Sequence, residues 1–392
     1  MNGRFSASTV DVVVVGGGVI GLSIAWRAAS RGLSVAVVDD CREQRASFAA
    51  AGMLAPISEL GPGEAELFGL NLRSAERYPS FVAELEQAAA CAVGYRRCGT
   101  LAVALDAGDA EVLDELHALQ VQHGLAAQRL RGSQCRRLEP ALATGVRSGI
   151  HIPDDHQIDN RRLLAALGVA GSGGGAIVVA GTVAEIITGG GRARGVRLTD
   201  DREVGAGIAV VLAAGCWSGE LLKRMALDLP QRPLKGQILR LRARPGTGVV
   251  WPGCTVRALV RGRSVYIAPR ADGELVVGAT MEDQGYDTTI TAGAVHDLLH
   301  DARTVLPGLD EAGLCECRAG LRPATPDNLP HIGLLGVGGP EGLVVATGHG
   351  RNGILLAPLT ADAVVGLVCD GSLPDAFSVC SPTRFTGKQS QP

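Results

Sequence analysis

The sequence has 392 residues, of which 46% are hydrophobic and 20% charged, and its formal net charge is -3. This composition allows a large core and excludes wholesale disorder, and the near-neutral charge argues against a nucleic-acid surface. The polar start of the chain and the absence of an apolar run of about 20 residues argue against a signal peptide and a membrane span. We therefore expect a cytoplasmic protein that contacts neither nucleic acid nor membrane.

The first predicted unit is a strand, a glycine-rich turn, a helix and a second strand. Residues 12–15 are four consecutive valines, typical of a strand buried on both faces of a parallel sheet. Residues 19–30 are rich in apolar and small side chains, which predicts a helix that ends at Gly32. A second strand is expected over residues 34–38, which completes one βαβ unit.

Gly16, Gly18 and Gly21 form a G-x-G-x-x-G pattern between that strand and that helix. Such glycines permit a tight turn, close approach of a pyrophosphate to backbone N–H groups, and close packing of helix on strand. Asp39 ends the second strand, where its carboxylate can accept both ribose hydroxyls and would repel a 2′-phosphate. The pattern predicts a bound dinucleotide, FAD or NAD, and its alternative is a glycine-rich turn without a ligand.

Residues 46–56 are a run of small residues that is too poor in charge for an ordinary surface loop. Small side chains let the backbone pass close to a flat ring system, which favours an extended FAD lying over this segment. The alternative is a tightly packed helix start.

The remaining segments predict a mixed α/β fold. Helices are expected at residues 65–91, 109–123 and 161–169, and strands at 99–105, 176–180 and 209–214, with a hairpin at 182–187 and 193–198. Short strands at 237–241, 264–268 and 275–279 indicate an antiparallel sheet, and a final strand and helix are expected at 342–346 and 354–368. We predict a Rossmann-like FAD-binding domain (1–90, 148–232 and 318–385) interleaved with a substrate domain on an antiparallel sheet (91–147 and 233–317), then a tail (386–392).

No metal site is predicted. Ten cysteines lack any Cys-x-x-Cys spacing, and the closest pair, Cys315 and Cys317, has no histidine nearby in the sequence. His296 and His300 lie four residues apart on a predicted helix, but the glutamate of a zinc protease motif is missing between them. We interpret the cysteines mostly as small buried side chains.

Several short motifs, in order along residues 10–370, resemble the D-amino-acid oxidase superfamily of FAD-dependent oxidoreductases, and within it the glycine oxidases of thiamine biosynthesis. Besides the glycine loop they are 49–54 (AAAGML), 158–161 (IDNR), 213–218 (AAGCWS), 233–237 (PLKGQ), 276–281 (VVGATM), 320–323 (GLRP) and 348–354 (GHGRNGI). The resemblance implies non-covalently bound FAD and a homo-oligomer.

The resemblance also implies which residues contact FAD. The ADP half would meet Val19, Ile20, Asp39 and Asp40, and the adenine would meet the backbone of Val183. The flavin would lie along Ala46, Ser47, Ala51, Gly52 and Met53, with its pyrimidine edge bordered by His349, Gly350, Arg351, Asn352, Gly353, Ile354 and Leu355. A helix that begins near Ile354 would direct its N-terminus toward the flavin and stabilise negative charge on the reduced ring.

Arg322 is the predicted carboxylate-binding residue, because a guanidinium can bind a carboxylate through two parallel hydrogen bonds and Pro323 stiffens its backbone. The alternative is a surface salt bridge. The resemblance implies that Tyr266 adds a hydroxyl to the carboxylate, that Met281 closes the pocket, and that Arg351 assists the carboxylate or controls access. For Tyr266 and Met281 the alternative is plain core packing.

The activity that the resemblance implies is oxidative deamination of glycine or a similarly small amino acid. Hydride transfer from Cα to flavin N5 requires a neutral amine and no protein base, and O2 then gives hydrogen peroxide. The imine would hydrolyse to glyoxylate and ammonia or pass to a thiazole-forming partner. Alternatives are an oxidase or dehydrogenase for sarcosine, a D-amino acid or a specialised-metabolite amine, or a flavin- or NAD-binding protein without turnover. Gly350 stands where family members carry an aromatic residue, which indicates a more mobile loop or a more open site.

Overall fold

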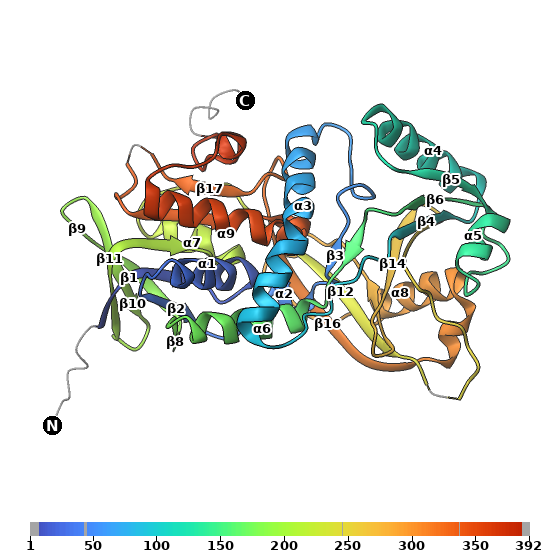
Figure 1. Ribbon diagram of the computed structural model, residues 1–392, viewed down its shortest axis with the longest axis horizontal. Coiled ribbons are helices and arrows are strands. Elements are labelled where there is room, and N and C mark those ends of the chain that lie inside the picture. The colour runs from blue at the N-terminus through green and yellow to red at the C-terminus, as the bar shows by residue number, and fades with distance from the viewer. Residues whose placement is uncertain (1–7, 43–44, 245, 337, 386–392) are drawn as a thin grey trace.

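The computed structural model describes residues 8–42, 45–244, 246–336 and 338–385, and the predicted tail at 386–392 lies outside these ranges. Figure 1 shows an elongated molecule with two lobes, one around α1 (Val19–Ser30) and α9 (Gly353–Asp370) and one around β4 (Thr100–Ala104) and α8 (Ala292–Val305). The helix α3 (Ala65–Ala89) stands between them.

The first lobe is built on a mostly parallel sheet. Its strand order is β17-β18-β11-β1-β2-β8, with β17 antiparallel to β18 and a hairpin of β9 and β10 attached to β11. The bounds are β1 (Ser8–Val15), β2 (Val35–Asp39), β8 (Ile177–Ala180), β9 (Val183–Gly189), β10 (Arg192–Leu198), β11 (Glu203–Leu212), β17 (His331–Leu334) and β18 (Leu343–Thr347). The predicted βαβ unit and the predicted hairpin are confirmed.

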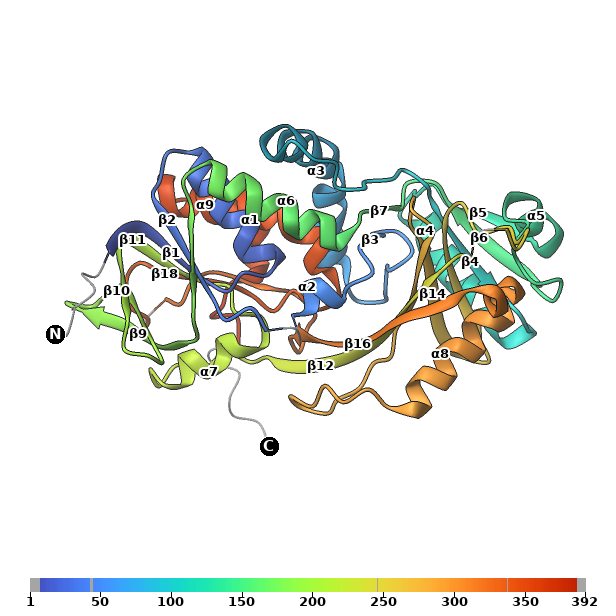
Figure 2. The same ribbon diagram turned by 90° about the horizontal axis from the view of Figure 1, so that it is seen from below.

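The valine run is buried on both faces of this sheet, as predicted. Val12 and Val14 pack in one core with α1, α6 (Asn160–Gly173) and α9, whereas Val13 and Val15 pack in another with β9, β10 and α7 (Ser218–Lys223). Figure 2 shows these three helices on one side of the sheet and α7 on the other. The alternation follows from the two-residue period of a strand.

The second lobe is built on a mixed sheet with the order β16-β12-β15-β14-β13-β4-β6-β5. The antiparallel pairing predicted for 237–241, 264–268 and 275–279 is confirmed by β12, β14 and β15, although β13 pairs in parallel with β4. The bounds are β5 (Gln128–Arg131), β6 (Ser148–Ile152), β12 (Arg232–Arg242), β13 (Thr255–Val260), β14 (Arg263–Pro269), β15 (Glu274–Gly278) and β16 (Gly313–Ala324).

The helix α8 covers one face of this second sheet, and α4 (Ala107–Gln122) packs on β4 and β6. Two short segments, α2 (Ala46–Ala49) and β3 (Met53–Leu54), approach the other face, where Ala51 packs against Ile238 and Val276. The remaining elements are β7 (His156–Gln157), which pairs with β3, α5 (Gly132–Leu138) and the 3-10 turns η1 (Gly215–Trp217), η2 (Pro307–Glu311), η3 (Gly350–Asn352) and η4 (Asp375–Cys380).

Two strands of the second sheet do not follow the predicted domain limits. The strand β6 belongs to the second sheet although it falls in the segment 148–232, and β16 crosses the predicted limit at 318. The domain limits therefore stay a prediction.

Only Cys135, Cys216, Cys254 and Cys380 are buried, so the interpretation of most cysteines as buried is wrong, because the others lie in loops, at helix ends or on the edge strand β16. Within the described ranges, one helix, which spans residues 350–370 and includes α9, is long and apolar enough to cross a membrane. It packs against α1 and α3 in the core, which explains its apolar composition.

Candidate active site

A cavity of about 710 Å³ extends from the glycine loop to the second sheet. Its nucleotide end is lined by residues predicted for the ADP half, namely Gly16, Gly18, Val19, Ile20, Asp39, Asp40 and Val183. Gly21 does not line the cavity. A Cβ on Gly21 would lie 1.9 Å from the carbonyl oxygen of Gly16, so Gly21 permits close packing of helix on turn, as its place in the pattern predicts.

Two arginines at this end were missed from the sequence. Arg45 donates to Asp39 Oδ2 at 2.6 Å and to the carbonyl of Gly17 at 3.0 Å, so one oxygen of Asp39 is already engaged. Arg42 pairs with Asp40 at 2.5 Å and stacks over the ring of Trp217 at 4.8 Å. Neither arginine belongs to a motif, and their nearness to Asp39 in the sequence was the only available signal.

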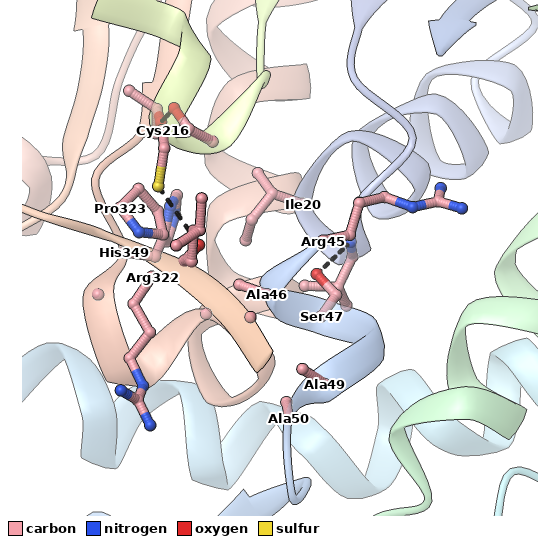
Figure 3. A pocket seen from close by; sticks show the side chains of 18 of the residues that line it. Ile20, Arg45, Ala46, Ser47, Ala49, Ala50, Cys216, Arg322, Pro323 and His349 are labelled. Atoms are coloured by element: carbon pink, nitrogen blue, oxygen red, sulfur yellow. Dashed lines mark hydrogen bonds between the residues drawn. The ribbon is translucent and has the colours of Figure 1, made fainter. Parts of the chain in front are cut away.

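The flavin-facing segment predicted at 46–53 lines the middle of the cavity through Ala46, Ser47, Ala51, Gly52 and Met53. Figure 3 shows Ala46, Ala49 and Ala50 of this segment beside the strand that carries Arg322. The packing is tight, because a Cβ on Gly320 of β16 would lie 2.6 Å from Cβ of Ala49. The segment is thus both a cavity wall and a closely packed helix start.

Buried polar side chains hold the carbonyl groups of this segment. Asn160 donates to the carbonyls of Ser47 and Phe48 at 2.8 and 3.1 Å, and Arg270 donates to the carbonyl of Ala51. Arg270 also donates to the carbonyl of Ile158 at 2.9 Å, and burial lowers the pKa of this guanidinium to about 10. The backbone of this segment is therefore held by side chains that do not themselves line the cavity.

Arg322 projects from β16 into the cavity, away from Cys216 and His349 (Figure 3). Its Nη1 donates to the carbonyl of Thr280 at 3.2 Å, and no described carboxylate forms an ion pair with it. Gly236 makes room for it, because a Cβ there would lie 2.3 Å from Arg322 Nη2. The alternative of a surface salt bridge is therefore wrong, and the guanidinium is available to an anion.

Tyr266 lies on the same face of the second sheet. It is opposite Gly278 on β15, where a Cβ would lie 2.3 Å from the tyrosine hydroxyl, so this glycine makes room for the ring. Burial raises the pKa of Tyr266, and the nearby charge of Arg322 lowers it in part. The hydroxyl is therefore protonated at neutral pH and can donate a hydrogen bond.

Met281 is 72% exposed and lines the cavity, so the alternative of core packing is wrong for this residue. It lies at the end of the VVGATM motif, beyond the last residue of β15. A flexible apolar side chain in this position fits the predicted closing role, which stays a prediction.

The predicted motif at 348–354 (GHGRNGI) lies in and around η3 and at the start of α9. His349, Gly350, Arg351, Gly353 and Ile354 line the cavity, whereas Asn352 and Leu355 are buried and do not. His349 accepts or donates a hydrogen bond with Thr360 Oγ1 at 3.1 Å, and burial lowers its pKa to about 3, so it is neutral.

Gly350 has φ of 54°, and a Cβ there would meet no atom within 4 Å. A side chain would therefore find space beside Gly350, and the predicted more mobile loop or more open site stays a prediction.

Arg351 is not free to meet a carboxylate. Its guanidinium pairs with Glu64 and, at 3.5 Å, with Glu59, and Glu59 also accepts from Arg257 Nη1 at 2.8 Å. Glu59 and Arg257 line the cavity and were missed from the sequence, because no pattern joins them. The predicted assistance of Arg351 to the substrate carboxylate stays a prediction that these ion pairs do not favour.

The cavity suits an extended dinucleotide with a flat ring system. A Cβ on Gly17 would lie 2.4 Å from Asp39 Oδ2, so only glycine lets the loop pass this close to the predicted ribose-binding carboxylate. Across the described residues, no group of three or more His, Cys, Asp or Glu side chains could hold a metal ion. His296 and His300 stack on each other on α8, and His296 is exposed.

A parallel sheet with a glycine loop at the N-terminus of its first helix defines a dinucleotide-binding protein. A family model described as FAD dependent oxidoreductase matches residues 11–367, so the chain belongs to this family and its cofactor is FAD.

Relatives and solved structures agree with this assignment. The chain is 36% identical to a bifunctional protein ThiO/ThiG of Synechocystis sp. over 96% of this chain and 54% of that protein, so it spans about half the length of that relative. It is 33% identical to a glycine oxidase of Geobacillus kaustophilus over 96% of this chain and 98% of that protein. The crystal structure of glycine oxidase from Geobacillus kaustophilus matches with a TM-score of 0.88 and 32% identity, over 96% of this chain and 99% of that one.

Proposed function

We propose that this protein oxidatively deaminates glycine or a similarly small amino acid. The observation that carries the proposal is the guanidinium of Arg322, which lies in the FAD cavity without a carboxylate partner among the described residues. The similarity to proteins named glycine oxidase supports the choice of a small amino acid.

In the proposed reaction Arg322 binds the substrate carboxylate through two charge-assisted hydrogen bonds, and the hydroxyl of Tyr266 donates a further one. These contacts hold the substrate Cα toward the segment 46–53. Bound FAD supplies the acceptor for the hydride that leaves Cα, and O2 takes up the electrons as hydrogen peroxide. The amine loses its proton to solvent before this step, and the resulting imine adds water to give glyoxylate and ammonia.

The fixed backbone of the flavin-facing segment provides orientation. Since Arg270 and Asn160, which do not line the cavity, hold its carbonyl groups, the segment needs little rearrangement when substrate binds. Burial lowers the pKa of His349 to about 3, so its imidazole accepts a proton poorly and is not expected to serve as a base.

The proposal is tested by turnover on a panel of amines with peroxide detection. Purified protein should be yellow with bound flavin and should oxidise glycine with formation of peroxide and glyoxylate. Activity on bulky D-amino acids with none on glycine would overturn the choice of substrate. Rapid reduction by glycine with slow reoxidation by O2 would instead identify a dehydrogenase, and protein without flavin would overturn the scheme.

Three wider expectations belong to the same proposal: a role in thiamine biosynthesis, a cytoplasmic location and a homo-oligomeric state. The similarity to a bifunctional ThiO/ThiG protein supports the first. Deletion of the gene should create a growth requirement that thiamine relieves. Size-exclusion chromatography with light scattering measures the oligomeric state.

A further inference from the structure

The substrate end of the cavity contains more positive charge than a single carboxylate requires. Four arginines of the described part of the chain line it: Arg257 on β13, Arg263 on β14, Arg322 on β16 and Arg351 in η3. Three of them have carboxylate partners, because Arg263 pairs with Asp301 and the other two share Glu59. Arg322 is the one of these four that has no carboxylate partner among the described residues.

Arg257 is a second cation beside the proposed carboxylate site. It stands directly opposite Tyr266 in the antiparallel pair of β13 and β14, so the two side chains lie on the same face of the sheet. Its guanidinium donates to Glu59 Oε1 at 2.8 Å, and the side chains of Arg257 and Glu59 are 22% and 15% exposed. A half-buried pair of this kind is screened little by water or salt.

Glu59 is held in place by its neighbours. The backbone N–H groups of Ile57 and Ser58 donate to the buried carboxylate of Asp155 at 3.0 and 3.1 Å, and Gln120 donates to the carbonyl of Ile57 at 3.1 Å. The chain just before Glu59 is therefore fixed, and its carboxylate stays between Arg257 and Arg351.

We propose that Glu59 is a specificity-determining residue that restricts the substrate to one carboxylate, because it neutralises Arg257 beside Tyr266 and faces the cavity with its own negative charge. This inference rests on the proposed function for the identity of the site. A substrate with a second carboxylate would have to displace Glu59 from Arg257 and would be repelled by it. Small amines with a single carboxylate meet neither obstacle.

The test uses FAD-loaded protein and two ligands that cannot be oxidised, acetate with one carboxylate and malonate with two. Their dissociation constants are measured from the change in flavin absorbance. In Glu59→Gln the affinity for malonate relative to acetate should rise about tenfold, because the guanidinium of Arg257 becomes free to donate a charge-assisted hydrogen bond to the second carboxylate. The ratio of kcat/KM for iminodiacetate to that for glycine should rise in parallel.

Two further variants assign the effect to Arg257. The gain should disappear in the double variant Glu59→Gln/Arg257→Gln, and Glu84→Gln should leave the ratio unchanged, because Glu84 pairs with Arg27 and Arg77, which do not line the cavity. An unchanged ratio in Glu59→Gln, or a gain that persists in the double variant, would overturn the inference.

The outcome remains decisive if Glu59→Gln does not fold. Arg257→Gln leaves Glu59 charged without this partner, so malonate should then bind about tenfold more weakly relative to acetate, and an unchanged ratio would contradict the role of the pair. Failure of the proposed function is recognised separately, as absence of glycine turnover by the wild-type protein. The acetate and malonate measurements require no turnover.

Discussion

The guanidinium of Arg322 is expected to contribute directly to substrate affinity. A hydrogen bond to a charged group contributes about 1.5–3 kcal/mol, so loss of a bidentate contact in Arg322→Ala should lower kcat/KM for glycine about 100-fold or more. Arg322→Lys keeps the charge but loses the fork geometry and should recover only part of this loss. Steady-state kinetics at saturating FAD measures both variants.

Arg242→Ala is the matched control, because this arginine lies at the end of β12 with its side chain 51% exposed. Its kcat/KM should remain close to that of the wild type. If Arg322→Ala keeps its FAD and its affinity for glycine, the substrate carboxylate binds elsewhere.

At the residue scale, the sequence was informative where a motif exists. The GLRP and VVGATM motifs led to Arg322 and Met281, and both line the same cavity as Tyr266. Glu59 and Arg257 escaped notice because they are 198 residues apart and belong to no motif. A single sequence does not reveal which charges a fold brings together across such a separation.

The flavin-facing segment is the element whose position depends most on buried polar groups. Arg270→Ala would leave the carbonyl oxygens of Ala51 and Ile158 buried without this donor. An unsatisfied buried group costs about 1–3 kcal/mol, so the free energy of unfolding should fall by roughly 3 kcal/mol and FAD should bind more weakly. Urea unfolding and FAD titration test this, with Arg242→Ala as a control expected to change stability by less than about 0.5 kcal/mol.

The close approach of β12 to Arg322 gives a second prediction at this scale. In Gly236→Ala the new Cβ would displace the guanidinium, and a misplacement of about 1 Å can lower the rate about 100-fold. We expect a large fall in kcat/KM for glycine while FAD stays bound. Gly168→Ala on α6, where a Cβ meets no atom within 4 Å, should leave the kinetics unchanged, and equal losses in both variants would contradict the steric argument.

The long periodic helices were predicted well, whereas several short or edge strands were not. The helices α1, α3 and α9 have long apolar patterns and were predicted within a few residues. The edge strands β5 and β16 and the two-residue strand β7 were not predicted, because their side chains do not alternate clearly between buried and exposed. Their place is set by pairing with distant strands.

At the scale of the whole molecule, the cavity exists because interleaved segments bring the glycine loop of the first sheet and one face of the second sheet together around the segment 46–53. From the sequence, the glycine loop predicted only the nucleotide end of the cavity. Prediction of the substrate end would have required the register of β12, β14, β15 and β16. This register places Gly236, Gly278 and Gly320 on the face that carries Tyr266 and Arg322. Periodicity alone does not fix the register of strands that are far apart in the chain.

Acid should destabilise the molecule through buried neutral histidines. Burial and the nearby Arg384 lower the pKa of His331 to about 4, below its ordinary 6.5, so the unfolded state binds more protons as pH falls through this window. The contribution of such a histidine to the free energy of unfolding is fully present above pH 6.5. It falls by about 1.4 kcal/mol per pH unit toward pH 4. Asp155 acts oppositely below pH 6, because burial raises its pKa to about 6 and protonation then favours the folded state.

The contribution of His331 is isolated by comparing the pH dependence of variants. Between pH 6.5 and 5 the free energy of unfolding of wild type should fall more steeply than that of His331→Gln, in which the proton-binding group is absent. His296→Gln removes an exposed histidine and should keep the slope of the wild type. Parallel slopes for wild type and His331→Gln in urea unfolding would show that His331 titrates alike in the folded and unfolded states, contrary to its burial beside Arg384.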